Sequence, residues 1–172
     1  MACDWNLLKS ESKPEPKPVD CMLEFDLKVG VPNTEFGYGP MGMLWGFTQS
    51  WWSPYHSTSG DLNMGPNKLD IVGIYGFFWL EYVVYIGITA KQDKGSHQKV
   101  VDLFQNNVLW VTVDGVRYNL GKSPPVASPE LFPAPSGPYD YVFSYRNSDA
   151  QKLGETIKQN GDKTIHVCLN WK

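Results

Sequence analysis

The chain has 172 residues, of which 42% are apolar, 14% are aromatic and only 19% are charged, and this length fits one domain with or without extended arms. So much apolar material excludes wholesale disorder, and the 16 Gly and 13 Pro are more than a helical bundle would carry. The net charge is −3 and only Arg117 and Arg146 are arginines, so we expect no direct contact with nucleic acid.

Residues 1–20 are predicted to form an extended N-terminal arm. Residues 9–18 alternate Lys and Glu around three prolines. Proline fixes φ and removes a backbone donor, which favours a polyproline-like conformation. The segment also lacks the basic-then-apolar order of a signal peptide. No apolar run in the chain reaches the roughly 20 residues of a membrane span, so we expect no membrane span.

Antiparallel strands are predicted from residue 21 onward. Residues 23–29 alternate apolar and charged side chains, which indicates a strand with one buried face. Residues 71–88 are rich in β-branched and aromatic side chains but too long for one strand, so two strands with a turn or bulge between them are predicted. Asp114-Gly115 separates the β-rich segments 108–113 and 116–120, and this pair is typical of a two-residue hairpin turn.

Two more strands and two short helices complete the predicted elements. The strands are residues 139–145 and 164–171. One helix is predicted at residues 96–105, with the serine at its start as the N-cap. The other is predicted at residues 148–159, with Gly161 as a left-handed residue after its end.

Short strands separated by turns, with little helix, predict an all-β fold. The expected architecture is an antiparallel β-sandwich of jelly-roll or immunoglobulin-like type, formed as one domain by residues 21–172. Residues 121–138 hold six prolines and are predicted to form an ordered excursion along a surface. Leu131 and Phe132 are its candidate contact residues.

Residues 44–55 form a segment dense in aromatic side chains, and their spacing fits neither a helix nor a strand. The candidate binding residues in this segment are Trp45, Trp51, Trp52 and Tyr55. Three interpretations remain open. The segment plugs the end of the core, or it is buried against another subunit as aromatic anchors often are, or its flat rings stack on sugars or bases.

Two motifs suggest ligand sites but lack the context that those sites need. Gly37, Gly39 and Gly42 spell the dinucleotide-binding pattern, yet no helix pattern follows directly, so a glycine-rich turn is expected. Residues 61–70 suggest a calcium loop, but Pro66 and the missing bidentate Glu at its twelfth position favour a surface turn. We therefore expect no cofactor and no metal.

Histidine and cysteine offer one enzyme hypothesis. His166 and Cys168 share a face of the last predicted strand, as a base and a nucleophile would, but an orienting acid and an oxyanion-binding element are missing. Glu24 and Asp26 share a strand face and are expected to be solvated. An odd number of cysteines without a leader favours reduced thiols in a cytosol, and the three are Cys3, Cys21 and Cys168.

Four segments of the chain occur in an order that is similar to a known family. They are Leu27-Lys28-Val29-Gly30, Phe36-Gly37-Tyr38-Gly39, Met41-Gly42-Met43-Leu44 and Val111-Thr112-Val113-Asp114-Gly115-Val116-Arg117-Tyr118. Over about residues 25–120 the chain resembles small β-rich modules in tail and fibre proteins of tailed bacteriophages. It departs from them after Gly42, where Met43-Leu44-Trp45 replaces a serine-rich turn.

The resemblance implies a structural or attachment protein of a virus particle, assembled in the host cytoplasm. It implies contacts with other virion proteins, homo-oligomers, and binding to a host surface that can include a glycan. It implies no catalytic residues, so we expect no enzyme. The alternative function is a lectin-like β-sandwich that binds carbohydrate on a platform of Trp51, Trp52 and Tyr55.

Overall fold

The computed structural model describes residues 21–32, 44–49, 58–93, 95–123, 125, 137 and 139–172. Within these residues it has nine strands and two helices. The predicted arm, residues 1–20, lies outside the described residues. So do most of the predicted excursion, residues 121–138, and the glycine-rich turn at residues 37–42.

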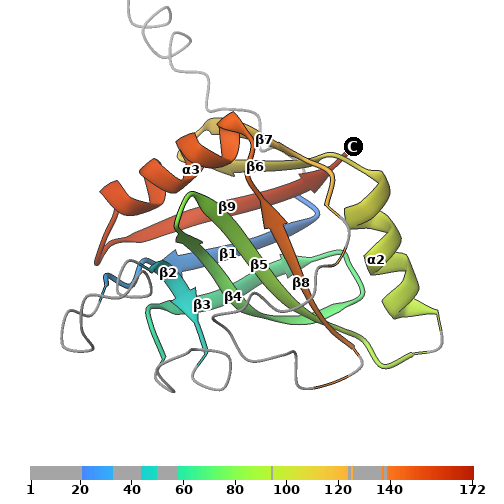
Figure 1. Ribbon diagram of the computed structural model, residues 1–172. Coiled ribbons are helices and arrows are strands. Elements are labelled where there is room, and N and C mark those ends of the chain that lie inside the picture. The colour runs from blue at the N-terminus through green and yellow to red at the C-terminus, as the bar shows by residue number, and fades with distance from the viewer. Residues whose placement is uncertain are drawn as a thin grey trace, which may run out of the picture.

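Two antiparallel sheets face each other, and their strands cross in the view of Figure 1. The five-stranded sheet, which we call sheet A, has the order β3 (Asp61–Asn67), β1 (Leu23–Lys28), β9 (Thr164–Trp171), β6 (Leu109–Val113) and β7 (Val116–Gly121). The four-stranded sheet, sheet B, has the order β2 (Trp45–Thr48), β4 (Ile71–Leu80), β5 (Val83–Ala90) and β8 (Asp140–Tyr145). The predicted all-β antiparallel sandwich is confirmed.

The two helices lie at the margins of the sandwich. Helix α3 (Ser148–Gln159) lies along its upper end and contacts strands of both sheets, and α2 (Ser96–Asn106) lies at one side (Figure 1). The side chain of Asn147 caps α3 by accepting a hydrogen bond from Ala150 N at 2.9 Å. Asp149 in the first turn accepts a hydrogen bond from Asn119 N at 2.8 Å, which ties the helix to β7.

The main core lies between the sheets. Alternate residues of β1 and β9 point inward, as the period-two pattern predicts, and they meet apolar side chains from sheet B. Phe25 contacts Phe77 edge to face, with ring centroids 5.3 Å apart. Phe104 of α2 stacks on Phe143 of β8 at 3.7 Å. Each such buried aromatic contributes about 1.5–3 kcal/mol of transfer free energy, so this layer holds the two sheets together.

Glycines allow the sheets to meet closely at one corner. Gly30 N donates to Gly46 O at 2.8 Å, and Gly46 N donates to Gly30 O at 3.0 Å. A Cβ at Gly30 would lie 2.4 Å from Gly60 N, and one at Gly46 would lie 2.4 Å from Phe77 O. Gly46 and Gly60 also have φ of 135° and 65°, which other residues rarely adopt. Larger residues at this corner would therefore separate β1 from sheet B.

Two strands differ from the predictions. Residues 45–48, in the segment that fitted neither helix nor strand, form β2 because they pair with β4. Residues 61–67, predicted as part of a surface turn, form β3 against β1. Strand β3 is an exposed edge with Gly65, Pro66 and an irregular register, features that protect edge strands from further pairing and that erase the alternating pattern.

Both predicted helices are confirmed, but their predicted end signals are wrong. The N-cap of helix α2 is Gly95, with φ of 94°, whereas Ser96 was predicted to be the N-cap. After α3 the left-handed residue is Asp162, with φ of 64°, and not Gly161. Gly161 has another reason to lack a side chain, because a Cβ there would lie 2.8 Å from the ring of Trp45.

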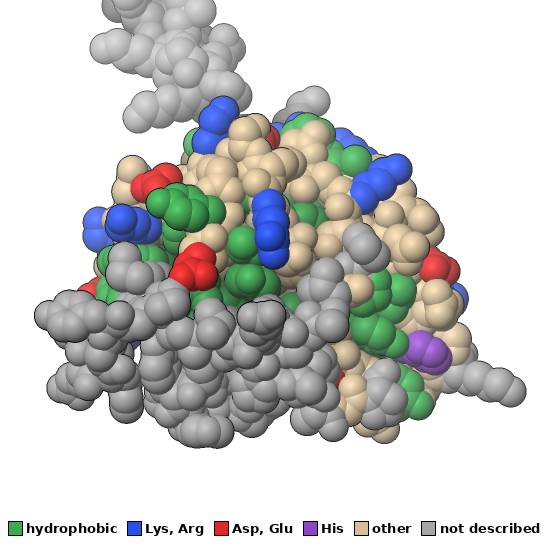
Figure 2. Space-filling model, in the orientation of Figure 1, with side chains coloured by type: hydrophobic (Ala, Val, Ile, Leu, Met, Phe, Trp, Pro, Cys, Tyr) green, Lys and Arg blue, Asp and Glu red, His purple; other side chains and the backbone are tan. Residues whose placement is uncertain are grey.

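The surface shown in Figure 2 carries mixed side chains. Among the described residues on this face, Lys and Arg lie in separate places and not in one stripe. Within the part of the chain that the structure describes, no helix is long and apolar enough to cross a membrane.

Candidate functional site

The predicted aromatic contact residues are only partly described. Trp45 lies in β2, is half-buried, and packs against the main core beside Gly161. This position fits the interpretation in which an aromatic side chain closes the end of the core. The other candidates lie outside the described residues, so their binding roles stay predictions: Trp51, Trp52, Tyr55, Leu131 and Phe132.

The prediction of reduced thiols is wrong for Cys21 and Cys168. These two residues form a disulfide, with their Cα atoms 5.5 Å apart and 147 positions between them in sequence. Sequence spacing could not predict the pair, because the pairing of β1 with β9 brings the two residues together. Since the sulfur of Cys168 is bonded, it is not available as the thiolate nucleophile of the enzyme hypothesis.

His166 has acidic partners on the outer face of sheet A. Its Nδ1 lies 2.9 Å from Asp26 Oδ1, and its Nε2 lies 3.7 Å from Glu24 Oε2. Register explains the first contact, because Asp26 and His166 are directly opposite on β1 and β9. The side chains of His166 and Asp26 are 56% and 57% exposed, so the pair is a solvated surface contact of small energetic value.

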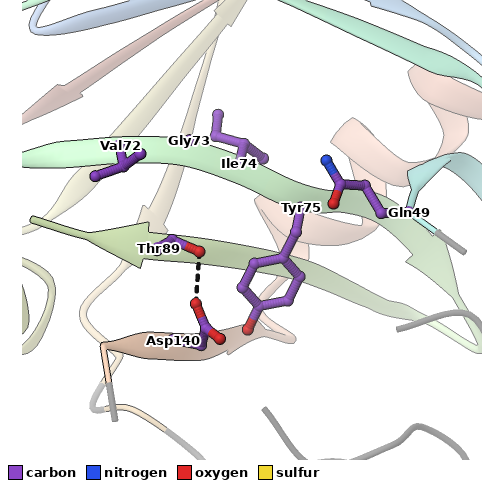
Figure 3. Close-up of a pocket in the computed structure, with 7 residues that line it drawn as sticks. All are labelled: Gln49, Val72, Gly73, Ile74, Tyr75, Thr89 and Asp140. Atoms are coloured by element: carbon purple, nitrogen blue, oxygen red, sulfur yellow. Dashed lines mark hydrogen bonds between the residues drawn. The ribbon is translucent and has the colours of Figure 1, made fainter. Parts of the chain in front are cut away.

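A pocket of about 310 Å³ lies on the outer face of sheet B, the face turned away from sheet A (Figure 3). We call it the sheet B pocket. Strands β4, β5 and β8 and the residue after β2 supply its lining, which consists of Gln49, Val72, Gly73, Ile74, Tyr75, Thr89 and Asp140.

The polar wall of the sheet B pocket comes from one row of the sheet. Gly73 is opposite Thr89 in the β4–β5 pair, and Thr89 is opposite Asp140 in the β5–β8 pair. Thr89 Oγ1 donates a hydrogen bond to Asp140 Oδ1 at 2.5 Å, which orients the carboxylate (Figure 3). The register of β4 shifts on both sides of Gly73, and such bulges often re-aim side chains beside binding sites.

Tyr75 closes the other side of the pocket. Its ring lies over Gly87, where a Cβ would come within 2.3 Å of the ring, and its hydroxyl donates to Tyr141 O at 2.9 Å. Burial, with a smaller contribution from the negative charge of Asp140, raises the pKa of Tyr75 far above its ordinary value. The phenol therefore stays protonated and keeps its donor role.

A second feature is the tip of the β4–β5 hairpin, residues Glu81 and Tyr82. Leu80 and Val83 pair directly, so these two residues form a two-residue turn, with φ of 47° and 67°. Such turns favour Asn and Gly, and a bulky residue at positive φ is strained. Tyr82 is nevertheless 74% exposed. Gln151 of α3 donates to Tyr82 O at 2.6 Å, and Trp79 packs edge to face against the Tyr82 ring at 6.1 Å.

Sequence reasoning missed the pocket, and it predicted a turn or bulge within residues 71–88 without giving its position. The pocket joins residues from segments far apart in sequence, and no motif links Gln49 or Gly73 to Asp140. The hairpin tip had one signal, since Glu81 is the only charged residue within the long β-rich segment 71–88. A charge at that point indicates an exposed turn between two buried strands.

Comparison with known proteins identifies one family. No curated protein and no solved structure matches the chain. The sequence matches the family described as Domain of unknown function (DUF7823) over residues 55–172, which is well over half of the chain. These residues include β3 to β9 and both helices, hence most of the sheet B pocket and the hairpin tip. The chain therefore belongs to the DUF7823 family.

Proposed function

We propose that the chain is a non-enzymatic structural or attachment protein of a virus particle. It acts as a rigid β-sandwich that binds other virion proteins, including further copies of itself. The bacteriophage-like segments support this proposal. Residues 27–30 comprise the end of β1 and Gly30, which pairs with Gly46 of sheet B. Residues 111–118 form the β6–β7 hairpin, so both segments belong to the framework of the sandwich.

The observation that carries the proposal is the exposed, strained tyrosine at the β4–β5 tip. A strained backbone costs about 1–3 kcal/mol and persists where the surrounding structure holds it and function uses it. Trp79 packs against the Tyr82 ring and Gln151 donates a hydrogen bond to the Tyr82 carbonyl, while most of the Tyr82 side chain is exposed to solvent. Tyrosine is among the residues that carry most binding energy in protein interfaces. A rigid, aromatic tip is therefore suited to docking in a pocket of a partner.

The disulfide supports a location on the particle exterior. Disulfides persist in oxidising surroundings, which include virion surfaces, and are rare in the cytosol. Both cysteines are buried against sheet A, so the bond belongs to the folded sandwich. We propose that assembly occurs in the host cytoplasm and that the disulfide is present in the released particle.

The Tyr82→Asn variant tests the contact role of the hairpin tip. Asparagine tolerates positive φ, and this gain offsets the lost contact between the Tyr82 ring and Trp79, so the stability of the fold is expected to change little. Loss of the ring is expected to weaken self-association or binding to particle proteins at least about tenfold. Sedimentation velocity over a concentration series measures the association, and urea unfolding measures the stability.

Val116→Ser is the matched control, because Val116 is the exposed apolar residue at the tip of the β6–β7 hairpin. It is expected to leave association unchanged. Two results contradict the proposal. One is a Tyr82→Asn variant that associates as the wild type does. The other is a wild-type chain that stays monomeric at high micromolar concentration and binds no particle protein.

Carbohydrate binding is the second candidate function. The platform predicted for it lies outside the described residues.

A further inference from the structure

We propose that the tip of the β4–β5 hairpin forms a two-fold contact between two copies of this chain. The contact surface consists of Glu81, Tyr82, Arg146 and Gln151, and we call it the tip patch. The inference rests on the contact role proposed above for Tyr82. It adds the identity of the partner, which is a second copy, and the two charged residues that determine how the copies fit.

Gln151 of α3 holds the parts of the tip patch together. Its side-chain amide donates to Tyr82 O at 2.6 Å and to Arg146 O at 3.2 Å. These bonds join the turn between β4 and β5 to the residue that follows β8, where α3 lies beside the hairpin tip (Figure 1). The patch is therefore ordered before a partner binds, which lowers the entropy cost of association.

The tip patch carries one negative and one positive charge. Glu81 and Arg146 are both exposed, and neither forms an ion pair with the other or with another described residue. Burial raises the pKa of Tyr85, while the charge of Arg146 lowers it and that of Glu81 raises it, so both charges lie near this one hydroxyl. Two opposite charges therefore share one patch without contacting each other.

Such a patch is complementary to a second copy of itself. A two-fold axis places the same surface on both sides of a contact, so each residue meets its counterpart's neighbour and the reverse. Glu81 of each copy then pairs with Arg146 of the other, and the two Tyr82 rings meet between these ion pairs. Two exposed tyrosines supply the apolar area of the contact.

The backbone of the turn indicates that both of its side chains are used. Glu81 and Tyr82 have φ of 47° and 67°. The β6–β7 hairpin has a two-residue turn with φ of 49° and 81°, and it is formed by Asp114-Gly115, residues that tolerate this conformation. The β4–β5 turn instead keeps two long side chains at a cost in backbone energy. A cation across the two-fold axis gives the Glu81 carboxylate a role that the fold does not.

The contact is small, so the dimer of free chains is weak. A hairpin tip buries less surface than the roughly 1,600 Å² of a standard interface, and we expect a Kd of about 100 µM. The same contact becomes effective between copies held on one particle, because binding is then intramolecular. Salt screens exposed ion pairs, so an increase of sodium chloride from about 50 mM to about 1 M is expected to raise the Kd about fivefold.

Reversal of the two charges tests the pairing. In Glu81→Arg the patch carries two positive charges, and in Arg146→Glu it carries two negative charges. Each variant alone therefore repels its own copies, and its Kd is expected to rise at least about tenfold. In an equimolar mixture both contacts join opposite charges, so the Kd is expected to return to within about threefold of the wild type. Sedimentation velocity of the full chains, up to high micromolar concentration, measures all of these values.

Arg117→Glu is the matched control, because it reverses the chain's other arginine, which is exposed at the β6–β7 hairpin. It is expected to dimerise as the wild type does. Thermal unfolding checks that each variant is folded. Glu81→Arg is expected to keep the wild-type unfolding midpoint, because both side chains are strained alike by the positive φ.

Three results overturn the inference and leave the contact role of Tyr82 in place. The first is self-association that Tyr82→Asn abolishes but that both charge variants retain at wild-type strength. The second is a mixture that associates no better than its two components do separately, although the wild type dimerises. The third is a wild type that stays monomeric at high micromolar concentration and binds particle proteins through Tyr82. Tyr82-dependent growth beyond the dimer also overturns it, because a two-fold contact closes at two copies.

Discussion

Two buried tyrosines make the stability of the fold sensitive to alkaline pH. Burial raises the pKa of Tyr75 and of Tyr145 above the ordinary value near 10. Below that value both groups are protonated in the folded and the unfolded chain. Above it only the unfolded chain ionises, so the free energy of unfolding is expected to fall by about 1.4 kcal/mol per pH unit for each tyrosine. Urea unfolding between pH 9 and pH 11 measures the slope.

Tyr145→Phe isolates one contribution to that slope. The Tyr145 hydroxyl is buried and has no hydrogen-bond partner among the described residues. Removing it is expected to raise the free energy of unfolding at pH 7 by about 1 kcal/mol, because an unsatisfied polar group is removed. The alkaline slope is expected to decrease by about 1.4 kcal/mol per pH unit, the contribution of one tyrosine. An unchanged slope would show that Tyr145 ionises as readily in the folded chain as in the unfolded chain.

At the scale of single elements, helix α3 packs closely on strand β4 because Gly154 of the helix has no side chain. A Cβ at Gly154 would lie 2.1 Å from the indole of Trp79, whose ring atoms cannot move aside as the end of a flexible side chain can. Gly154 costs about 1 kcal/mol of helix propensity relative to alanine, yet the helix forms at the predicted residues. Close packing of Trp79 on the helix backbone offsets that cost.

Gly154→Ala is therefore expected to destabilise the protein in spite of its better helix propensity. The overpacking penalty of about 1–3 kcal/mol is offset by a propensity gain of about 1 kcal/mol, so we expect a net loss of up to about 2 kcal/mol in urea unfolding. Lys152→Ala, at an exposed position of the same helix, is the control and should change the stability by less than about 0.5 kcal/mol. A more stable Gly154→Ala variant would contradict the packing described for Trp79.

Elements with a buried and an exposed face could be predicted from sequence. Strand β1 follows its alternating pattern, and the Asp114-Gly115 turn has positive φ at both residues, 49° and 81°. Strands β2 and β3 could not be predicted, because β2 depends on pairing with β4 and β3 is an exposed edge without alternation. The site was harder still. Local sequence patterns show which face of a strand or helix is buried. The sheet B pocket depends instead on register shifts and on which distant strands pair.

At the scale of the whole molecule, the disulfide joins the two ends of the described sandwich. Cys21 precedes β1 and Cys168 lies in β9, so the bond closes a loop that contains nearly all of the strands. Chain-entropy models give about 4.7 kcal/mol for a loop of about 100 residues, and this loop is longer. We expect the double variant Cys21→Ser/Cys168→Ser to lose about 4–5 kcal/mol in urea unfolding.

A reducing agent provides the matched measurement. It should lower the stability of the wild type to that of the double variant and leave the double variant unchanged. Equal stability of the wild type in oxidising and reducing buffer would contradict a structural role for the bond.

The proposal of a virion structural protein is tested most directly by the protein composition of purified particles. Particles from cells that carry the coding sequence would be purified by density gradient and analysed by quantitative mass spectrometry. The account predicts that the chain co-purifies with the particles at a constant copy number relative to the major particle proteins. Recovery of the chain only in the soluble fraction, with none in the particles, would contradict it.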